Sequence, residues 1–206
     1  MGKMSSGEEA KAEELCDAIS FLASKGWAPG TGGNFSVVTS QKPLRLLVTR
    51  SGVDKHTVTP NELLMVNRQG KTPGKSPKPS AETLLHTTIA RIAKAQCILH
   101  THSVWNTVVS IRETSSTLEL TGFEMLKGLK GVNSHEHVER IPVFDNSQDI
   151  PSLARKVSAR MNKEKGMHGF LLRGHGLYTW GKSVPEARRH VEIFEFLFEA
   201  YGRLGE

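Results

Sequence analysis

The sequence predicts an α/β fold, because segments with helical periodicity alternate with short apolar segments typical of buried strands. Helical spacing is clear from residue 8 to residue 25 and again after residue 183. Apolar runs at residues 44–49 and 169–173 have the length and composition of strands. The order of these elements alone does not decide whether the sheet is parallel or mixed.

The composition is that of an ordinary globular protein. With 206 residues, 37% of them hydrophobic and 23% charged, the chain can bury a sizeable core, and we expect residues 1–206 to form one domain. No apolar run approaches the roughly 18 residues of a membrane helix. The N-terminus lacks the apolar segment of a signal peptide, and two cysteines are too few for a disulfide framework. These features favour a cytoplasmic protein that does not contact a membrane.

The net charge of +6 does not by itself indicate nucleic-acid binding. Lysine and arginine are scattered, and prolines break up their densest cluster at residues 71–78. Aromatic residues make up 6% and do not alternate with basic ones as a base-stacking surface requires. A positive balance suits an enzyme for anionic small molecules equally well, so we expect a small-molecule partner and no nucleic acid.

The first third of the chain combines a long helix with strands and turns. Residues 8–25 have one apolar face, and Gly26 ends that helix. Leu44–Thr49 has the pattern of a strand, and the capping box Thr59-Pro60-Asn61-Glu62 predicts the start of a short helix. Residues 66–78 are rich in turn formers and predict a hairpin followed by a surface loop.

The rest of the chain alternates helices and strands. Residues 78–94 form an expected helix, and a capping box at 183–186 starts the last one. Ile141-Pro142-Val143-Phe144 predicts an edge strand, because proline cannot donate to a strand ladder. The other expected elements are a strand from Cys97, a short helix to about Ser110, a Ser/Thr-rich turn, a helix from Ser152 to about Arg160, and strands at 169–173 and 177–180.

Two histidines stand at the end of an apolar strand in Cys97-Ile98-Leu99-His100-Thr101-His102. Because side chains alternate in a strand, His100 and His102 point to the same side and can share one metal ion. A catalytic zinc ion takes three protein ligands and leaves one position open. The pattern therefore requires a third ligand elsewhere in the chain.

Seven further histidines compete for that third position. His175 follows an apolar strand and is flanked by Gly174 and Gly176, which leave room around its ring, so we favour it. His135 and His137 form a second His-x-His, but they lie in a polar segment without a rigid strand. The others have helical, loop or polar surroundings that favour a surface or structural role, namely His56, His86, His168 and His190.

Two turns are candidate anion sites. Gly30-Thr31-Gly32-Gly33-Asn34 follows a helix and precedes a strand, which is the reverse of a dinucleotide fingerprint. Its glycines would let backbone N–H groups approach an anion, although an ordinary turn explains them equally well. Ser51-Gly52 is a second candidate. Glu82 lies in the first turn of a helix, where the helix dipole alone would account for a carboxylate.

These segments together resemble the class II aldolase-like proteins, over residues from about 8 to 204. The resemblance rests on motifs in the typical order: Gly30-Thr31-Gly32-Gly33-Asn34-x-Ser36, Ser51-Gly52, Pro79-Ser80-Ala81-Glu82, His100-Thr101-His102 and Gly174-His175-Gly176-x-x-x-Trp180-Gly181. It implies a three-layer α/β/α fold with a central, mainly antiparallel sheet. It also implies a homotetramer with sites near subunit interfaces and one zinc ion per subunit, bound by His100, His102 and His175.

Within that superfamily, the chain length and Glu124-Met125-Leu126-Lys127-Gly128 most resemble the methylthioribulose-1-phosphate dehydratases of methionine salvage. The resemblance implies zinc-dependent loss of water from 5-methylthioribulose 1-phosphate, with Glu124 as the acid/base. Sugar-phosphate aldolases instead use the glutamate that corresponds to Glu82. We favour Glu124, with Glu82 assisting or replacing it. The expected phosphate ligands are Gly32, Gly33, Asn34, Ser51 and Gly52, with Lys127 as an extra cation.

Two other functions stay open. A class II sugar-phosphate aldolase would share the metal but cleave the C3–C4 bond of a ketose 1-phosphate. A noncatalytic aldolase-like module would bind partners, although three histidines and an available glutamate argue against it. A structural zinc site usually has four protein ligands, and Cys97 lies on the opposite face of its strand from His100.

Overall fold

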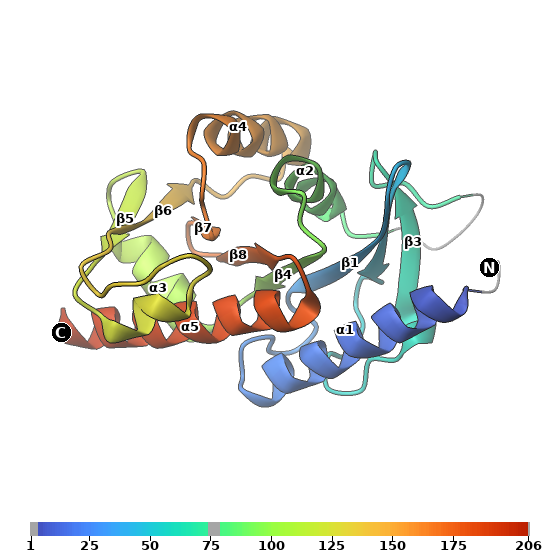
Figure 1. Ribbon diagram of the computed structural model, residues 1–206, viewed down its shortest axis with the longest axis horizontal. Coiled ribbons are helices and arrows are strands. Elements are labelled where there is room, and N and C mark those ends of the chain that lie inside the picture. Colours follow the sequence, from blue (N-terminus) through green and yellow to red (C-terminus); the bar gives the residue numbers. More distant parts are fainter. Residues whose placement is uncertain (1–3, 74–78, 206) are drawn as a thin grey trace.

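One eight-stranded sheet forms the centre of the computed structural model, which describes residues 4–73 and 79–205 (Figure 1). Its strand order is β3-β2-β1-β4-β8-β7-β6-β5, so β4 and β8 lie in the middle. Neighbouring strands are antiparallel except β6 and β7. The strands are β1 (Asn34–Gln41), β2 (Leu44–Thr49), β3 (Leu63–Asn67), β4 (Cys97–Thr101), β5 (Thr117–Leu120), β6 (Glu139–Phe144), β7 (Gly169–Leu172) and β8 (Gly176–Gly181).

Helices cover both faces of this sheet. α2 and α4 pack together on one face, whereas α1, α3 and α5 cover the other (Figure 1). This confirms the three-layer α/β/α fold with a mainly antiparallel sheet. The helices are α1 (Ser6–Ser24), α2 (Thr83–Ala93), α3 (Val104–Arg112), α4 (Ile150–Lys163) and α5 (Val184–Leu204), with short 3-10 helices η1 (Pro60–Glu62) and η2 (Glu124–Gly128).

The central strand β4 sends its side chains to both helix layers. Cys97 and Leu99 are buried with the apolar side chains of α1, whereas Ile98 is buried with those of α2 and α4. The alternation along a strand places His100 on the same face as Ile98. The metal-binding candidate therefore faces the layer that contains α2, the helix preceded by Glu82.

The short helix expected at the capping box is a single 3-10 turn. The box forms as predicted, but η1 ends at Glu62 and β3 begins at the next residue. Leu63 is buried against one layer and Leu64 against the other, so the strand lacks the alternating pattern that would have revealed it. Residues 74–78 of the expected surface loop lie outside the described residues.

The expectation of an edge strand at Pro142 is also wrong. β6 lies between β7 and β5, and β5 follows directly after the bend at residues 115–116, where no strand was expected. Pro142 pairs with Thr117 of β5, whereas β7 pairs only with Val143 and Phe144, beyond the proline. The short pairing with β7 therefore tolerates a residue that cannot donate there.

Candidate metal centre and anion pocket

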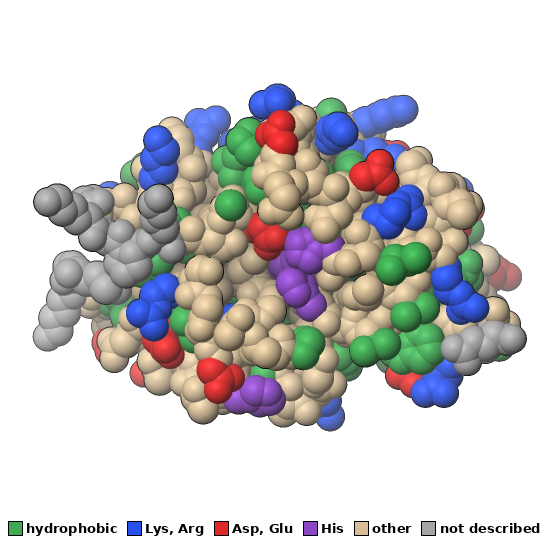
Figure 2. Space-filling model, turned by 180° about the vertical axis from the view of Figure 1, so that it is seen from behind, with side chains coloured by type: hydrophobic (Ala, Val, Ile, Leu, Met, Phe, Trp, Pro, Cys, Tyr) green, Lys and Arg blue, Asp and Glu red, His purple; other side chains and the backbone are tan. Residues whose placement is uncertain are grey.

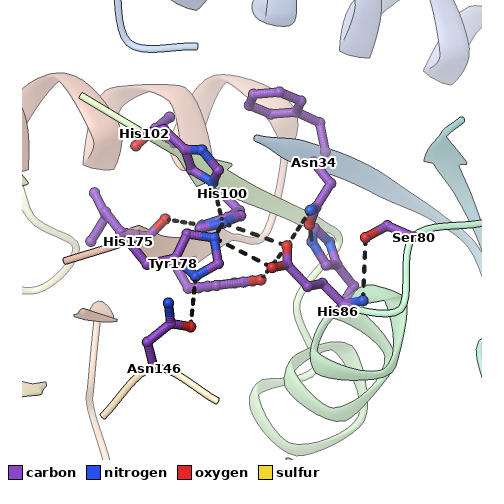
Figure 3. A network of polar contacts seen from close by, with 12 residues as sticks. Asn34, Ser80, His86, His100, His102, Asn146, His175 and Tyr178 are labelled. Atoms are coloured by element: carbon purple, nitrogen blue, oxygen red, sulfur yellow. Dashed lines mark hydrogen bonds and ion pairs between the residues drawn. The ribbon is translucent and has the colours of Figure 1, made fainter. Parts of the chain in front are cut away.

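Three histidines converge at one end of β4 and β8. His100 lies in β4, His102 follows directly after that strand, and His175 lies in the turn between β7 and β8. The Nε2 atoms of His100 and His102 are 2.8 Å apart, and those of His100 and His175 are 3.4 Å apart (Figure 3). The structure thus brings together the three residues that the sequence pointed to, in a group that could hold a metal ion.

Two of the three rings are oriented through their other nitrogen. Nδ1 of His100 lies 2.9 Å from the carbonyl oxygen of Leu177, and Nδ1 of His175 lies 3.2 Å from Oδ1 of Asn146. Both partners are acceptors, so each Nδ1 carries the proton. The Nε2 lone pairs are then free to bind a metal, which is the outer-shell arrangement of many histidine ligands.

The surroundings keep His100 and His102 neutral. Burial, together with His102 and His175, lowers the pKa of His100 well below its usual value. Burial and His175 lower the pKa of His102 to about 4. A metal ligand must be neutral imidazole, so the donor set fits a divalent cation at neutral pH.

Two glycines provide the space for the rings. A Cβ on Gly32 would lie 2.9 Å from Nδ1 of His102, and a Cβ on Gly176 would collide with the carbonyl oxygen of Thr101. The sequence-based argument assigned clearance around the histidines to Gly174 and Gly176, but a Cβ on Gly174 would meet only Ile111. Gly32, from the first glycine-rich turn, and Gly176 therefore leave room for the histidine rings, whereas Gly174 does not contact them.

Glu82 lies against the histidines. It is the N-cap residue of α2, yet its side chain makes no capping hydrogen bond. Its Oε1 lies 3.4 Å from Nε2 of His175, and its Oε2 lies 3.6 Å from Nε2 of His100. Oε2 also accepts hydrogen bonds from Tyr178 (3.1 Å) and Asn34 (2.5 Å) (Figure 3). The helix dipole is therefore not the only explanation for this carboxylate.

The two small-polar turns line one pocket beside the three histidines. This pocket brings the turn at 31–34 next to the turn at 49–52, with His102 and Glu82 at one side. Histidine side chains reach the surface near the middle of the face shown in Figure 2, with an acidic side chain beside them. Of the expected phosphate ligands, the pocket is lined by Gly32, Gly33, Asn34, Ser51 and Gly52.

The cations in this pocket are not the expected one. Lys127 is absent from its lining, and it forms an ion pair with Glu124. Arg50 and Lys55 line the pocket instead, and the ammonium group of Lys55 donates to the carbonyl oxygens of Thr31 (2.9 Å) and Val53 (2.8 Å). Its burial lowers its pKa. The turn at 50–55 was noted in the sequence, but nothing in the pattern indicated that this lysine would be buried.

Glu124 lies apart from the histidines of its own chain. It begins η2, its side chain is 69% exposed, and it pairs with Lys127 and His135. Among the described residues, its contacts include none of the three metal-binding candidates. The second His-x-His is also separate, because His137 hydrogen-bonds to the buried Glu139 at 2.9 Å.

Sequence reasoning also missed a buried carboxylate behind the site. Glu195 of α5 accepts hydrogen bonds from Ser103 (2.5 Å), Asn106 (3.2 Å) and Thr101 (3.3 Å). Burial raises its pKa to about 7. The available signal was a single glutamate among the apolar residues of the buried helix face.

Comparison with known proteins identifies the family. Residues 13–201 match the family described as Class II Aldolase and Adducin N-terminal domain. The chain belongs to this class II aldolase family. It is 47% identical over 186 residues to a methylthioribulose-1-phosphate dehydratase of Yersinia enterocolitica, covering 90% of this chain and 88% of that protein. It is 44% identical over 191 residues to the enzyme of that name from Enterobacter sp., covering 92% and 93%.

Solved structures agree on the fold. L-fuculose-1-phosphate aldolase from Thermus thermophilus has a TM-score of 0.75 at 26% identity, covering 95% of this chain and 97% of that one. The Escherichia coli protein YgbL, titled a putative aldolase/epimerase/decarboxylase, has a TM-score of 0.81 at 24% identity, covering 97% and 91%. Among the described residues, no helix is both long and apolar enough to cross a membrane.

Proposed function

We propose that the chain dehydrates 5-methylthioribulose 1-phosphate to 2,3-diketo-5-methylthiopentyl 1-phosphate, a hydro-lyase reaction of methionine salvage. The observation that carries this proposal is the identity of 44–47% to dehydratases of that name over about nine tenths of the chain. The three converging histidines and the adjoining anion pocket supply the groups that such a reaction needs.

We infer that the cofactor is one zinc ion per subunit, held by His100, His102 and His175. Three neutral imidazoles with an open side are a common ligand set for catalytic zinc. A zinc ion bound there would act as a Lewis acid toward the carbonyl oxygen of the substrate. Glu82 would add a negative charge beside the ion, since its oxygens lie 3.4 and 3.6 Å from two ligand nitrogens.

The phosphate is proposed to bind in the pocket between the two turns. Backbone N–H groups near Gly32, Gly33 and Gly52 and the hydroxyl of Ser51 can donate to phosphate oxygens, and Lys55 supplies a positive charge. Asn34 contributes indirectly, because its side-chain amide is bonded to Glu82. Lys127 does not line this pocket and pairs with Glu124, so we assign it no role in the phosphate site of its own chain.

Dehydration requires a group that takes a proton from one carbon and delivers a proton to the hydroxyl group that leaves the next carbon. We propose that Glu124 takes the proton from C3 and returns it to the C4 hydroxyl, so that the C4–O bond breaks and water leaves. The resulting enol then tautomerises to the diketone. Because Glu124 is exposed and its ion-pair partners are Lys127 and His135, we propose that it serves the site of a neighbouring subunit. The homotetramer and cytoplasmic location implied by the resemblance remain predictions.

The second candidate is aldol cleavage by the same site. It is favoured by one observation, namely that Glu82 contacts the metal-binding histidines. In that reaction Glu82 would carry the proton and the C3–C4 bond would break. A noncatalytic module is less well supported, because it would not need three converging histidines beside a pocket.

Activity of zinc-loaded Glu124→Gln and Glu82→Gln chains on 5-methylthioribulose 1-phosphate tests these roles. Loss of a positioned acid/base typically lowers the rate by about 10²–10⁴-fold. We expect a loss of that size for Glu124→Gln and a smaller one for Glu82→Gln. Equal zinc content in all chains is the control. The reverse order of the two losses would contradict the assignment of Glu124.

A further inference from the structure

A buried row of polar side chains leads away from the metal centre. It starts at Glu82, passes through Asn34 and His86, and ends at Ser36 (Asn34 and His86 are labelled in Figure 3). Asn34 and Ser36 are two residues apart on β1, and Glu82 and His86 are four residues apart at the start of α2. These spacings place each pair on one face of its element, so strand and helix interlock.

The chemistry of these groups fixes the direction of each hydrogen bond. An ionised Glu82 only accepts, so Asn34 must present its amide nitrogen to it, at 2.5 Å. The amide oxygen of Asn34 then faces Nε2 of His86, also at 2.5 Å, and that nitrogen must carry a proton. Nδ1 of His86 is left as the acceptor for the hydroxyl of Ser36 at 2.8 Å.

His86 can fill this role because it stays neutral. The side chain is completely buried, and burial lowers its pKa to about 3. If the amide of Asn34 turned over, its oxygen would face the carboxylate of Glu82 and its nitrogen would face the Nε2–H of His86. Both contacts would then be repulsive, so the Nε2–H tautomer holds the amide in one orientation.

We propose that His86 is a positioning residue of the metal centre, which acts through Asn34 to aim the Glu82 carboxylate at His100 and His175. Oε2 of Glu82 is held by Asn34 and Tyr178, which leaves Oε1 directed at His175. The sequence-based argument gave His86 only a surface or structural role. Outer-shell groups of this kind typically change metal affinity or activity by about 10–100-fold.

The experiment compares His86→Leu, which fills the volume without a donor, with His86→Gln, which keeps a side-chain N–H. We expect His86→Leu to weaken zinc binding by about 10-fold or more in chelator competition. His86→Gln should recover most of that loss. In a Glu82→Gln background, His86→Leu should change zinc affinity less than about twofold, because coupled residues are not additive.

The matched control is His190→Leu. His190 is also buried and neutral, with its pKa lowered to about 4 by burial, but it bonds to the backbone at Trp180 and Lys130. This variant should lower thermal stability and leave zinc affinity unchanged. If His86→Leu behaves like His190→Leu, or weakens zinc binding equally with and without Glu82, His86 is only structural and the proposal fails.

Nitrogen NMR of the metal-free chain supplies a readout that needs no substrate. The His86 ring should show the Nε2–H tautomer, and an Nδ1–H signal would overturn the proposal. The zinc-affinity and NMR measurements do not depend on the proposed dehydratase function. Only a comparison of the kinetics of these variants would rest on it. Failure of that function would appear as an inactive wild-type chain, whereas failure of the inference would appear in the tautomer and in zinc affinity.

Discussion

His102 shows how much of the site depends on the contacts of single residues. It lies one residue beyond β4, and its backbone N–H donates to the carbonyl oxygen of Trp27 at 2.9 Å. The His-x-His spacing predicted that its ring would share a side with that of His100. It could not predict that Gly32, some 70 positions earlier, would provide the space for the ring.

Gly32→Ala should therefore weaken metal binding. The added Cβ would lie 2.9 Å from Nδ1 of His102 and 3.0 Å from the carbonyl oxygen of Pro29, so the ring or the turn must move. We expect zinc affinity to fall by about 10-fold or more, by analogy with outer-shell changes at metal sites. Chelator competition measures this. Unchanged affinity in a folded variant would show that the turn can move away without disturbing the ring.

Removal of a ligand should have a larger effect. His175→Ala deletes one of three imidazoles and leaves the other two in place at the end of β4. We expect the zinc content of purified protein to fall from about one ion per chain to nearly none, with loss of activity. Elemental analysis measures the zinc. Full zinc content in the variant would assign the ion to another set of ligands.

At the scale of elements, α5 supports the junction between β4 and α3. Glu195 reaches from α5 to Thr101 and Ser103, on either side of His102, and to Asn106 in α3. A buried carboxylate with three neutral donors and a pKa of about 7 carries a cost when it ionises. The junction is thus held by a group whose charge varies near neutral pH.

Stability of the metal-free chain should reflect this group. The folded pKa of Glu195 is raised above its unfolded value of about 4.5, so its contribution is present below pH 4.5 and is lost as pH rises through about 7. Relative to Glu195→Gln, wild type should lose about 2 kcal/mol between pH 5 and pH 8. Denaturant unfolding of both chains at the two pH values measures this. A constant difference would show that Glu195 ionises as it does in the unfolded chain.

Helices and strands were predicted well from the sequence where the element has one polar and one buried face. They were predicted poorly where both faces of the element are buried. α1 and α5 show a single apolar face, and their expected bounds differ from the observed ones by only one or two residues at the ends where both could be compared. β3 is buried on both faces and β5 is short and partly polar, so neither shows a clear period. The ends of elements, where most site residues lie, depend on contacts that the local sequence does not contain.

The residues of the candidate site also divide into those that local sequence predicts and those that it does not. His100, His102 and His175 could be selected from strand ends and glycine clearance. Lys55, Tyr178 and Glu195 could not, because each acquires its role from burial against a distant segment. Those contacts are set by the packing of helices on the sheet and not by the spacing of residues along the chain.

At the scale of the whole molecule, the single chain leaves apolar side chains exposed on α3 and α5. Exposure reaches 58% for Ile111, 50% for Phe196 and 79% for Leu204. Such side chains on neighbouring helices fit association with other copies. Glu124 precedes Met125, which is 38% exposed, so an interface over this segment would bring the carboxylate to another subunit.

Co-expression of two inactive variants tests this arrangement. Glu124→Gln chains keep the histidines, and His175→Ala chains keep Glu124, so mixed oligomers should regain activity if Glu124 acts on a neighbouring subunit. Glu82→Gln with His175→Ala should regain none, because Glu82 and His175 are in contact within one chain. Recovery is measured as activity per zinc ion. No recovery in the first mixture would place the function of Glu124 within its own chain or exclude it.

The most direct test of the dehydratase account is the identity of the product formed from 5-methylthioribulose 1-phosphate by the zinc-loaded wild-type chain. Mass spectrometry and carbon NMR distinguish loss of one water molecule from cleavage of the carbon chain. We predict a single diketone phosphate that retains the methylthio group, formed only when zinc is present and formed again when zinc is restored after chelation. Release of dihydroxyacetone phosphate would contradict the account and identify an aldolase.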